Sequence, residues 1–273
     1  MNEHSKVYWH EAFFEALKLE LHQYKDALEF QKEHHLSKEA LRMDVLIIKK
    51  NKDIRIEKNI GRIFKEHNIF EYKSESDSFS IWDYNKILGY GFLYSSFERI
   101  PMSDITLSIA LTIYPRELIK FLENERGLKV RDLGDGIYHI DGDIIPVQIL
   151  ESKKLSPDSN LFLRNLRSNL SAKDMLDTLQ AYEEQKFLNE RNVYLDRLVR
   201  ANLVAFKEAI KMNESINMTF HEILLEAAEE NGWLNDKFVE RKKIAKKLLL
   251  LGDSVEKVAE ATELPIETVI ALM

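Results

Sequence analysis

Residues 68–74 read NIFEYKS, and residues 41–48 read LRMDVLII. Each is a short apolar run of the kind that predicts a buried strand. Each run also carries charge where an inward-facing side chain should be apolar: Asp44 in the earlier run, Glu71 and Lys73 in the later one. Burying such a charge costs several kcal/mol unless the charge is paired or holds a cation. The two runs therefore predict both a sheet and a charged site at its edge.

The alternation of side chains along a strand decides how these charges are arranged. Because successive side chains point to opposite faces, Glu71 and Lys73 share one face while Tyr72 points away. If residues 41–49 and 69–74 form neighbouring strands, Asp44 joins Glu71 and Lys73 at one edge of the sheet. Two carboxylates and one amine on one face describe a magnesium site with a positioned lysine.

Composition limits the class of protein. The chain has 273 residues, of which 45% are hydrophobic and 31% are charged, which is typical of one large globular domain or two smaller ones. The absence of cysteine excludes disulfides and thiolate metal sites, so a metal must be bound by oxygen or imidazole. Residues 1–10 lack a signal-peptide pattern, and no apolar run approaches the roughly 20 residues that span a membrane. We expect a cytoplasmic protein without a membrane partner.

The net charge of −7 argues against a surface that binds nucleic acid everywhere, but it hides a local bias. Residues 42–65 contain eight basic and three acidic side chains, and Lys49 and Lys50 lie in this segment. We expect the segment to form a modest basic patch beside the site, with Lys49 and Lys50 in contact with DNA.

A long amphipathic helix is predicted over residues 8–32, where apolar residues recur every three to four positions. Glu20 falls on the apolar face of this helix, whereas Glu11 and Glu15 point outward. Two interpretations of Glu20 are open. It is either a salt-bridged residue at the edge of the core or a member of the acidic cluster.

The remaining segments up to residue 150 alternate between strand and helix patterns. A helix over residues 80–97 places Lys86 and Tyr90 one turn apart on its side. The other predicted elements are a helix over 115–125 and strands over 54–60, 63–73, 104–114, 128–133, 137–140 and 144–150. This order predicts an α/β domain, a mixed sheet flanked by helices.

Residues 151–160 are typical of a boundary, and nearly everything beyond them has a helical pattern. We therefore predict a domain over 1–155 and an all-helical region over 156–273, with helices at 160–169, 173–187, 192–212 and 220–231. A helix-turn-helix-like tail covers about 238–273. Its last helix contains Glu267 and no cation, which favours packing or a homodimer contact over reading of a DNA groove.

The E-x-K tripeptide alone is a weak indication, since it recurs in this chain. Glu151-Ser152-Lys153 follows a predicted strand, but no strand aspartate precedes it at a comparable distance. No Gly-x-Ser-x-Gly elbow and no phosphate-binding loop is found, so serine hydrolysis and ATP hydrolysis are not indicated.

Asp44, 26 intervening residues and then Glu71-Tyr72-Lys73 resemble the PD-(D/E)XK nuclease superfamily. Met43 replaces the proline of the motif, a loss that removes no ligand. The superfamily motif covers about the first half of the chain. The wider sequence is similar to the bacterial recombination-promoting nuclease and transposase group over residues 9–10, 43–50, 68–73, 86–90 and 251–259.

This resemblance implies a restriction-endonuclease-like core and a Mg²⁺-dependent DNA endonuclease that acts in recombination, mobile-element movement or phage defence. Asp44, Glu71 and the Tyr72 backbone carbonyl would bind Mg²⁺, for which Mn²⁺ is expected to substitute. Lys73 would position the attacking water, and Glu20 would bind the metal directly or through water. Lys86 and Tyr90 would either reach the phosphate backbone or form an exposed helix face. The rival interpretation is a catalytically silent nuclease-like scaffold that binds a protein partner.

Overall fold

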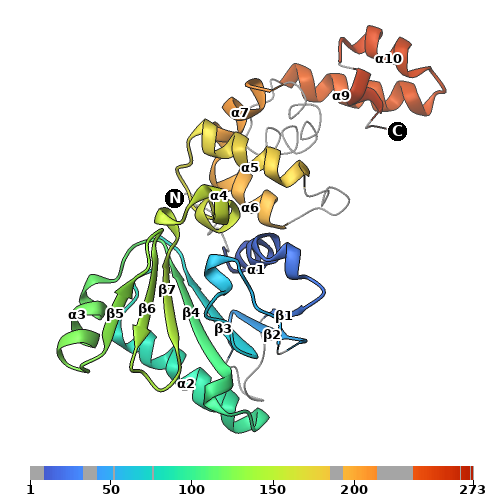
Figure 1. The fold of residues 1–273 in the computed structure, drawn as a ribbon. Coiled ribbons are helices and arrows are strands. Elements are labelled where there is room, and N and C mark those ends of the chain that lie inside the picture. The colour runs from blue at the N-terminus through green and yellow to red at the C-terminus, as the bar shows by residue number, and fades with distance from the viewer. Residues whose placement is uncertain are drawn as a thin grey trace. The chain divides into compact units, whose positions relative to one another are not determined.

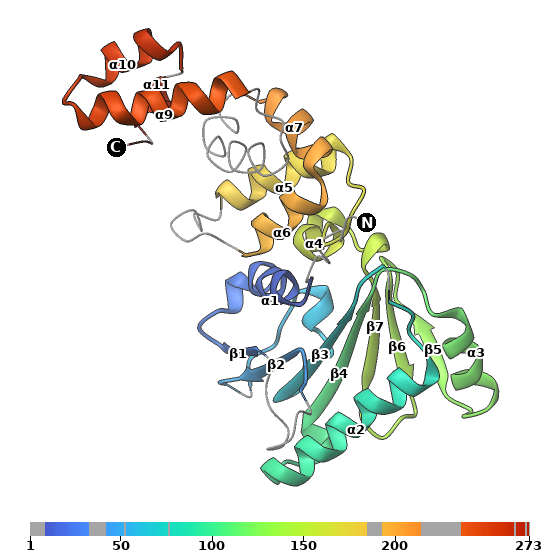
Figure 2. The ribbon, with the colours of Figure 1, turned by 180° about the vertical axis from the view of Figure 1, so that it is seen from behind.

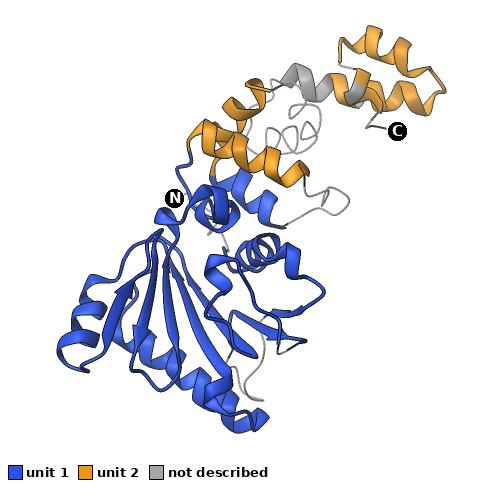
Figure 3. Ribbon diagram, in the orientation of Figure 1, with its two compact units in different colours: residues 1–170, 185–201 blue, residues 171–184, 202–273 orange. Residues whose placement is uncertain are grey.

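The computed structural model describes residues 9–32, 42–51, 53–75, 77–184, 193–213, 236–264, 266–270 and 272. The chain divides into two compact units (Figure 3). The first unit comprises residues 1–170 and 185–201, and the second comprises residues 171–184 and 202–273. The first unit contains a mixed sheet flanked by helices, and the described part of the second is helical, so the predicted α/β class is confirmed.

The sheet of the first unit has seven strands within the described residues (Figure 1). Their order is β1-β2-β3-β4-β7-β6-β5. The central strands β3, β4 and β7 are parallel, and the outer strands pair antiparallel. The strands are β1 (Leu28–Lys32), β2 (Val45–Lys49), β3 (His67–Lys73), β4 (Ile105–Leu111), β5 (Lys129–Asp132), β6 (Ile137–Asp141) and β7 (Val147–Glu151).

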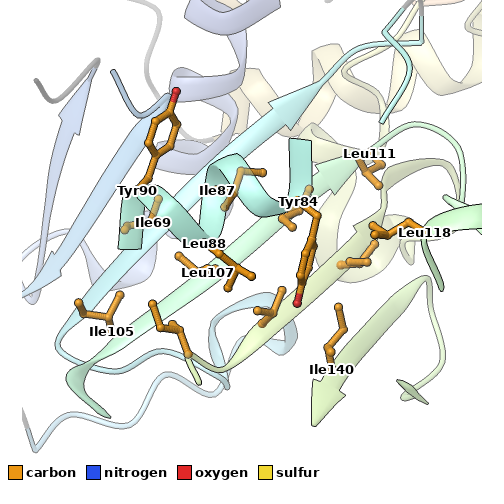
Figure 4. Packing of buried hydrophobic residues seen from close by; sticks show 14 of the residues in the cluster. Ile69, Tyr84, Ile87, Leu88, Tyr90, Ile105, Leu107, Leu111, Leu118 and Ile140 are labelled. Atoms are coloured by element: carbon orange, nitrogen blue, oxygen red, sulfur yellow. The ribbon is translucent and has the colours of Figure 1, made fainter. Parts of the chain in front are cut away.

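One face of the sheet packs against α2 (Ile81–Glu98) and α3 (Arg116–Asn124). This core is continuous from β2 to β6, because alternate residues of each strand point into it. Figure 4 shows Ile69, Leu107 and Ile140 of the strands gathered with Ile87 and Leu88 of α2. Every residue of β4 is buried, as expected of a central parallel strand covered on both faces.

The opposite face is covered by α1 (Trp9–Glu20), and α4 (Pro157–Arg164) and α6 (Val193–Ala201) pack on α1 (Figure 2). The Phe13 ring of α1 stacks on the Tyr72 ring of β3, with ring centroids 4.8 Å apart. The Tyr72 hydroxyl donates to the Leu166 carbonyl oxygen at 3.1 Å. Tyr72 therefore anchors this helical layer to the strand that carries Glu71 and Lys73.

The second unit contains α5 (Ala172–Glu184) and α7 (Leu203–Lys211), which contact each other. Three further helices, α9 (Asp236–Leu250), α10 (Val255–Thr262) and α11 (Ile266–Ile270), form a small core of their own. That core consists of Ala245, Val258, Leu264 and Val269. The described part of the tail predicted over about 238–273 is thus helical, whereas the helix predicted at 220–231 lies outside the described residues.

Three predicted elements differ from the structure, one of which is the single helix predicted over 192–212: it is broken at Asn202 into α6 and α7. The helix predicted over 8–32 ends at Glu20, and residues 28–32 form β1 instead. Pairing with β2 explains the change, because Leu28 and Phe30 pair with Lys49 and Ile47 in an antiparallel ladder. Residues 54–60 form no strand but lead into a 3₁₀ turn, Asn59–Gly61.

The two units also divide the chain differently from the predicted boundary between residues 155 and 156. Helices α4 and α6 belong to the first unit because both pack on α1. The second unit combines α5, which precedes α6 in the sequence, with helices that follow α6. A composition change along the chain could not reveal this interleaving.

Among the described residues, no helix combines the length and the apolar composition that a membrane crossing requires.

Helix α2 begins with a capping box, and its loss is expected to cost about 1 kcal/mol of unfolding free energy. The Ser80 amide donates to the Asp83 carboxylate at 2.9 Å, and the Asp83 amide donates to the Ser80 hydroxyl oxygen. Ser80→Ala removes the second of these bonds, and urea denaturation measures the loss. Ser78→Ala is the matched control, because Ser78 is exposed and precedes the cap; equal stability of both variants would contradict the expectation.

Candidate functional site

Asp44 lies immediately before β2, where that strand stops pairing with β3. The last pair of the register joins Val45 to Phe70. Beyond this pair, the Tyr72 amide hydrogen bonds to a side chain instead of to the β2 backbone. It donates to the Asp44 Oδ2 at 2.8 Å. This bond fixes the carboxylate at the edge of the sheet, beside the residues that follow Phe70.

Glu71 and Lys73 extend from β3 on the face covered by α2. The Lys73 Nζ lies 3.7 Å from the Glu71 Oε1, and only 7% of the Glu71 side chain is exposed. Tyr72 points to the other face, against Phe13. The alternation predicted from the sequence is therefore confirmed, and both charged groups lie on one side of the strand.

The Glu71 carboxylate is buried with one oxygen unsatisfied. Burial is the largest effect on its pKa, and the Asp44 charge adds to it, so that the pKa rises from 4.5 to about 7. The charges of Lys73, Lys86 and His10 oppose this rise without cancelling it. The Glu71 Oε2 has no hydrogen-bond partner. A buried acceptor without a partner is costly, and a bound cation would relieve that cost.

The residues at this edge fit a hard cation. Asp44 and Glu71 offer carboxylate oxygens, which Mg²⁺ prefers. In a strand, the N–H and C=O groups of one residue point toward the same side of the strand. Because the Tyr72 N–H points toward Asp44, the Tyr72 carbonyl oxygen also lies on the side of Asp44. Within the described ranges, no group of three or more His, Asp or Glu side chains is arranged to hold a metal. A cation here would complete its shell with water, as Mg²⁺ commonly does.

His10 of α1 also belongs to this cluster, although it was not among the predicted site residues. Its Nδ1 lies 3.4 Å from the Asp44 Oδ2, and its ring meets the Tyr72 ring edge-on at 6.4 Å. The hydrogen bond to Asp44 raises the His10 pKa most strongly, and burial opposes it. His10 precedes Phe13 by three residues and so shares the inward side of α1. That spacing, together with the place of His10 in the resembling segment 9–10, could have indicated it.

Glu20 does not join the cluster. Its Oε2 lies 2.7 Å from the Lys58 Nζ, and its Oε1 accepts the Leu163 amide hydrogen at 2.9 Å. Ten residues of helix separate it from His10, a rise of about 15 Å along α1. The structure thus favours the salt-bridge interpretation over the metal-binding one. Burial raises the Glu20 pKa, while Lys58 lowers it.

The predicted basic patch lies away from the cluster. Lys49 ends β2, so it stands five strand residues, about 17 Å, from Asp44. The Lys49 ammonium donates to the Ile54 carbonyl oxygen at 3.1 Å, and Lys50 follows it with an exposed side chain. Both lysines therefore lie at the opposite end of β2 from Asp44 and outside the carboxylate cluster, and their contact with DNA stays a prediction.

Lys86 of α2 faces the cluster, since its charge acts on Glu71. Tyr90 lies one turn further along α2 and is only 4% exposed, which excludes it from a DNA contact. The Lys86 ammonium lies 5.4 Å from the centre of the Tyr90 ring. Tyr90 therefore orients Lys86 through a cation–π contact, and Lys86 alone is available to a phosphate.

The raised pKa of Glu71 predicts a pH-dependent stability when no metal is bound. The folded pKa is about 7 against 4.5 for the unfolded chain, so the folded state binds more protons between these values. Stability is therefore greatest below about pH 4.5 as far as this group is concerned, and falls as the pH rises to about 7. We expect Glu71→Gln to raise the unfolding free energy by on the order of 2–3 kcal/mol above pH 7, with little change at low pH.

Denaturant titrations of both proteins at low and at neutral pH measure this difference. Glu75→Gln is the control, because Glu75 is exposed and its pKa is lowered by Lys153. A Glu71→Gln variant that is destabilised equally at both pH values would contradict the burial of an ionisable, unsatisfied carboxylate.

Comparison of the chain with protein-family models, with curated proteins and with solved structures finds no match.

Proposed function

We propose that the chain is a Mg²⁺-dependent DNA endonuclease that hydrolyses phosphodiester bonds at the edge of β3. One observation carries the proposal: Glu71 is buried beside Asp44 with an unsatisfied carboxylate oxygen, and Lys73 lies 3.7 Å from its other oxygen. A catalytically silent scaffold has no physical reason to retain this costly arrangement. An enzyme has one, because a cation and a phosphodiester complete it.

In this proposal, the residues of the site would have the following roles. Asp44, Glu71 and the Tyr72 carbonyl hold the cation, and the Tyr72 amide keeps Asp44 oriented. Bound Mg²⁺ supplies a Lewis acid for the phosphoryl oxygen and lowers the pKa of a bound water. Lys73 holds the attacking water and stabilises the negative charge that develops on the phosphate as the phosphorus–oxygen bond to the leaving group breaks. Lys86 compensates the charge of a neighbouring phosphate.

The choice of DNA rests on the resemblance to PD-(D/E)XK nucleases and on the two lysines beside the carboxylates. The same resemblance suggests a role in recombination, mobile-element movement or phage defence. We also propose a cytoplasmic location, which the lack of cysteine suits, and a homodimer contact through residues 156–273. Mn²⁺ is expected to replace Mg²⁺, because both take carboxylate, carbonyl and water oxygens.

Incubation of the purified protein with supercoiled plasmid DNA tests the function. We expect nicked and linear DNA to accumulate in Mg²⁺ or Mn²⁺, and cleavage to stop in a chelator and resume when the metal is restored. Cleavage that continues in the chelator, or that never appears across a range of divalent metals and DNA forms, would exclude the proposed function.

A further inference from the structure

A small open pocket of about 170 Å³ adjoins the candidate site. Lys73 forms part of its wall, so the pocket begins where the candidate site ends. Two loops complete it, one after β3 and one after β4, at the carboxyl ends of these parallel strands. A substrate phosphate held by Lys73 would therefore place the next chemical group of the substrate at this pocket.

The pocket offers flat apolar surface. Phe79 and Tyr114 both line it, and both are half-buried, so each ring is supported by the protein while part of it remains accessible. Phe79 packs against the core under α2. The Tyr114 ring packs on the Tyr138 ring with centroids 4.6 Å apart, and the Lys154 ammonium lies over the Tyr114 ring at 6.0 Å from its centre. Aromatic rings fixed in this way are stacking platforms for planar groups such as nucleobases.

The polar groups of the pocket disfavour a second phosphate. Glu75 and Asp77 also line the pocket and carry negative charge, and the Glu75 carboxylate is paired with the Lys153 ammonium at 2.5 Å. The Asp77 Oδ2 accepts the Ser74 hydroxyl hydrogen at 2.7 Å and the Ser74 amide hydrogen at 3.1 Å, which fixes this carboxylate in place. Carboxylates repel phosphate but accept hydrogen bonds from base amino groups. The lining thus suits a base rather than the sugar–phosphate backbone.

An exposed tryptophan lies next to the same region. Trp82 is 80% exposed in the first turn of α2, an unusual position for so large an apolar ring. Lys86 follows it by four residues, so both lie on one side of the helix. Phe79, which lines the pocket, precedes Trp82 by three residues at the start of α2.

We propose that the pocket beside Lys73 holds an unpaired nucleobase next to the scissile phosphate, with Trp82 stacking on a further base, so that the substrate is single-stranded DNA or an unpaired stretch. The inference rests on the proposed function and adds its substrate class. Bases stacked within a duplex cannot reach either ring, because their faces are covered by neighbouring bases.

Binding, rather than cleavage, tests this inference. Fluorescence anisotropy compares a labelled DNA strand of about 20 nucleotides with its duplex and with a duplex that contains an unpaired bubble, in chelator so that no cleavage occurs. We expect the single strand and the bubble to bind at least about tenfold more tightly than the duplex. Tryptophan fluorescence of the parent should be quenched by the single strand, and this quenching should be lost in Trp82→Phe.

Three variants separate stacking from general effects. Trp82→Ala should weaken single-strand binding about tenfold, whereas Trp82→Phe should weaken it less, because a ring remains. Phe79→Leu keeps apolar contact with the core but removes the ring, and should weaken single-strand binding several-fold with duplex binding unchanged. Phe97→Ala is the matched control, an exposed aromatic on α2 about 22 Å further along the helix.

The inference is overturned if the protein binds single strand and duplex with equal affinity or binds neither. It is also overturned if Trp82→Ala and Phe79→Leu both leave single-strand binding unchanged. Cleavage assays keep its failure distinct from that of the proposed function. Metal-dependent cleavage without a preference for unpaired DNA would refute the base pocket alone. A preference for unpaired DNA without cleavage in any metal would refute the nuclease function alone.

Discussion

Lys73→Ala is expected to lower the rate of DNA cleavage by about 10²- to 10³-fold while divalent-cation binding is retained. The Lys73 ammonium lies 3.7 Å from the Glu71 carboxylate and is 21% exposed, so it can reach a phosphate placed on the cation. Its removal takes away stabilisation of the transition state, not a metal ligand. Initial rates on plasmid DNA and calorimetric titration with Mn²⁺ measure the two effects separately.

Lys50→Ala is the control for this prediction. Lys50 is exposed and belongs to the segment that the sequence indicated as a DNA contact, yet it follows the opposite end of β2 from Asp44. We expect its loss to leave the cleavage rate nearly unchanged. A full rate in Lys73→Ala, or a larger loss in Lys50→Ala than in Lys73→Ala, would contradict the assigned site.

Glu20→Ala is expected to lower the unfolding free energy by about 3–5 kcal/mol, the loss typical of a broken buried ion pair. The Glu20 side chain is 2% exposed and lies 2.7 Å from the Lys58 Nζ, and it accepts the Leu163 amide hydrogen. Alanine leaves the Lys58 charge and a buried amide without their partner. Urea denaturation measures the loss.

Two comparisons sharpen the Glu20 prediction. Glu15→Ala removes a more exposed carboxylate that pairs with Lys18, and should cost about 1 kcal/mol or less. Replacing Glu20 and Lys58 together by methionine should recover much of the stability, because neither partner is then left unpaired. If Glu20→Ala left stability unchanged and abolished cation binding, Glu20 would be a metal ligand after all.

The centre of the site could be predicted because strand periodicity is strict. Glu71 and Lys73 are two residues apart in an apolar run, so any strand that buries Ile69 must bring both charges to the same face. Asp44 required a further step, the pairing of β2 with β3. The apolar composition of both runs indicates two buried strands, which favours their pairing. The observed register brings Asp44 beside Tyr72.

Helical periodicity predicts less of the site than strand periodicity does. It shows which side of a helix faces the core, but not which residues that side contacts. It correctly predicts that Glu20 faces the interior. The ion pair with Lys58, however, depends on the turn that begins at Lys58, within residues 54–60, for which the sequence predicts a strand. It also left His10 unnoticed, since the contact with Asp44 depends on how α1 crosses β3. Neither packing angle nor partner is encoded in the spacing of apolar residues within one helix.

The end of α1 shows a second limit. Leu21, Tyr24 and Leu28 are spaced as in a helix, while Leu28 and Phe30 also fit the alternation of a strand. The ladder with β2 decides between them, and Phe30 then packs edge-on against Phe14 with centroids 6.4 Å apart. Tertiary pairing of this kind overrides local preference.

The most direct test of the account is the rate at which parent, Asp44→Ala and Lys73→Ala proteins cleave the same supercoiled DNA in Mg²⁺, after circular dichroism has shown that each is folded. The account predicts cleavage by the parent and a loss of at least about a hundredfold in both variants. Cleavage by both variants at the parental rate would contradict it.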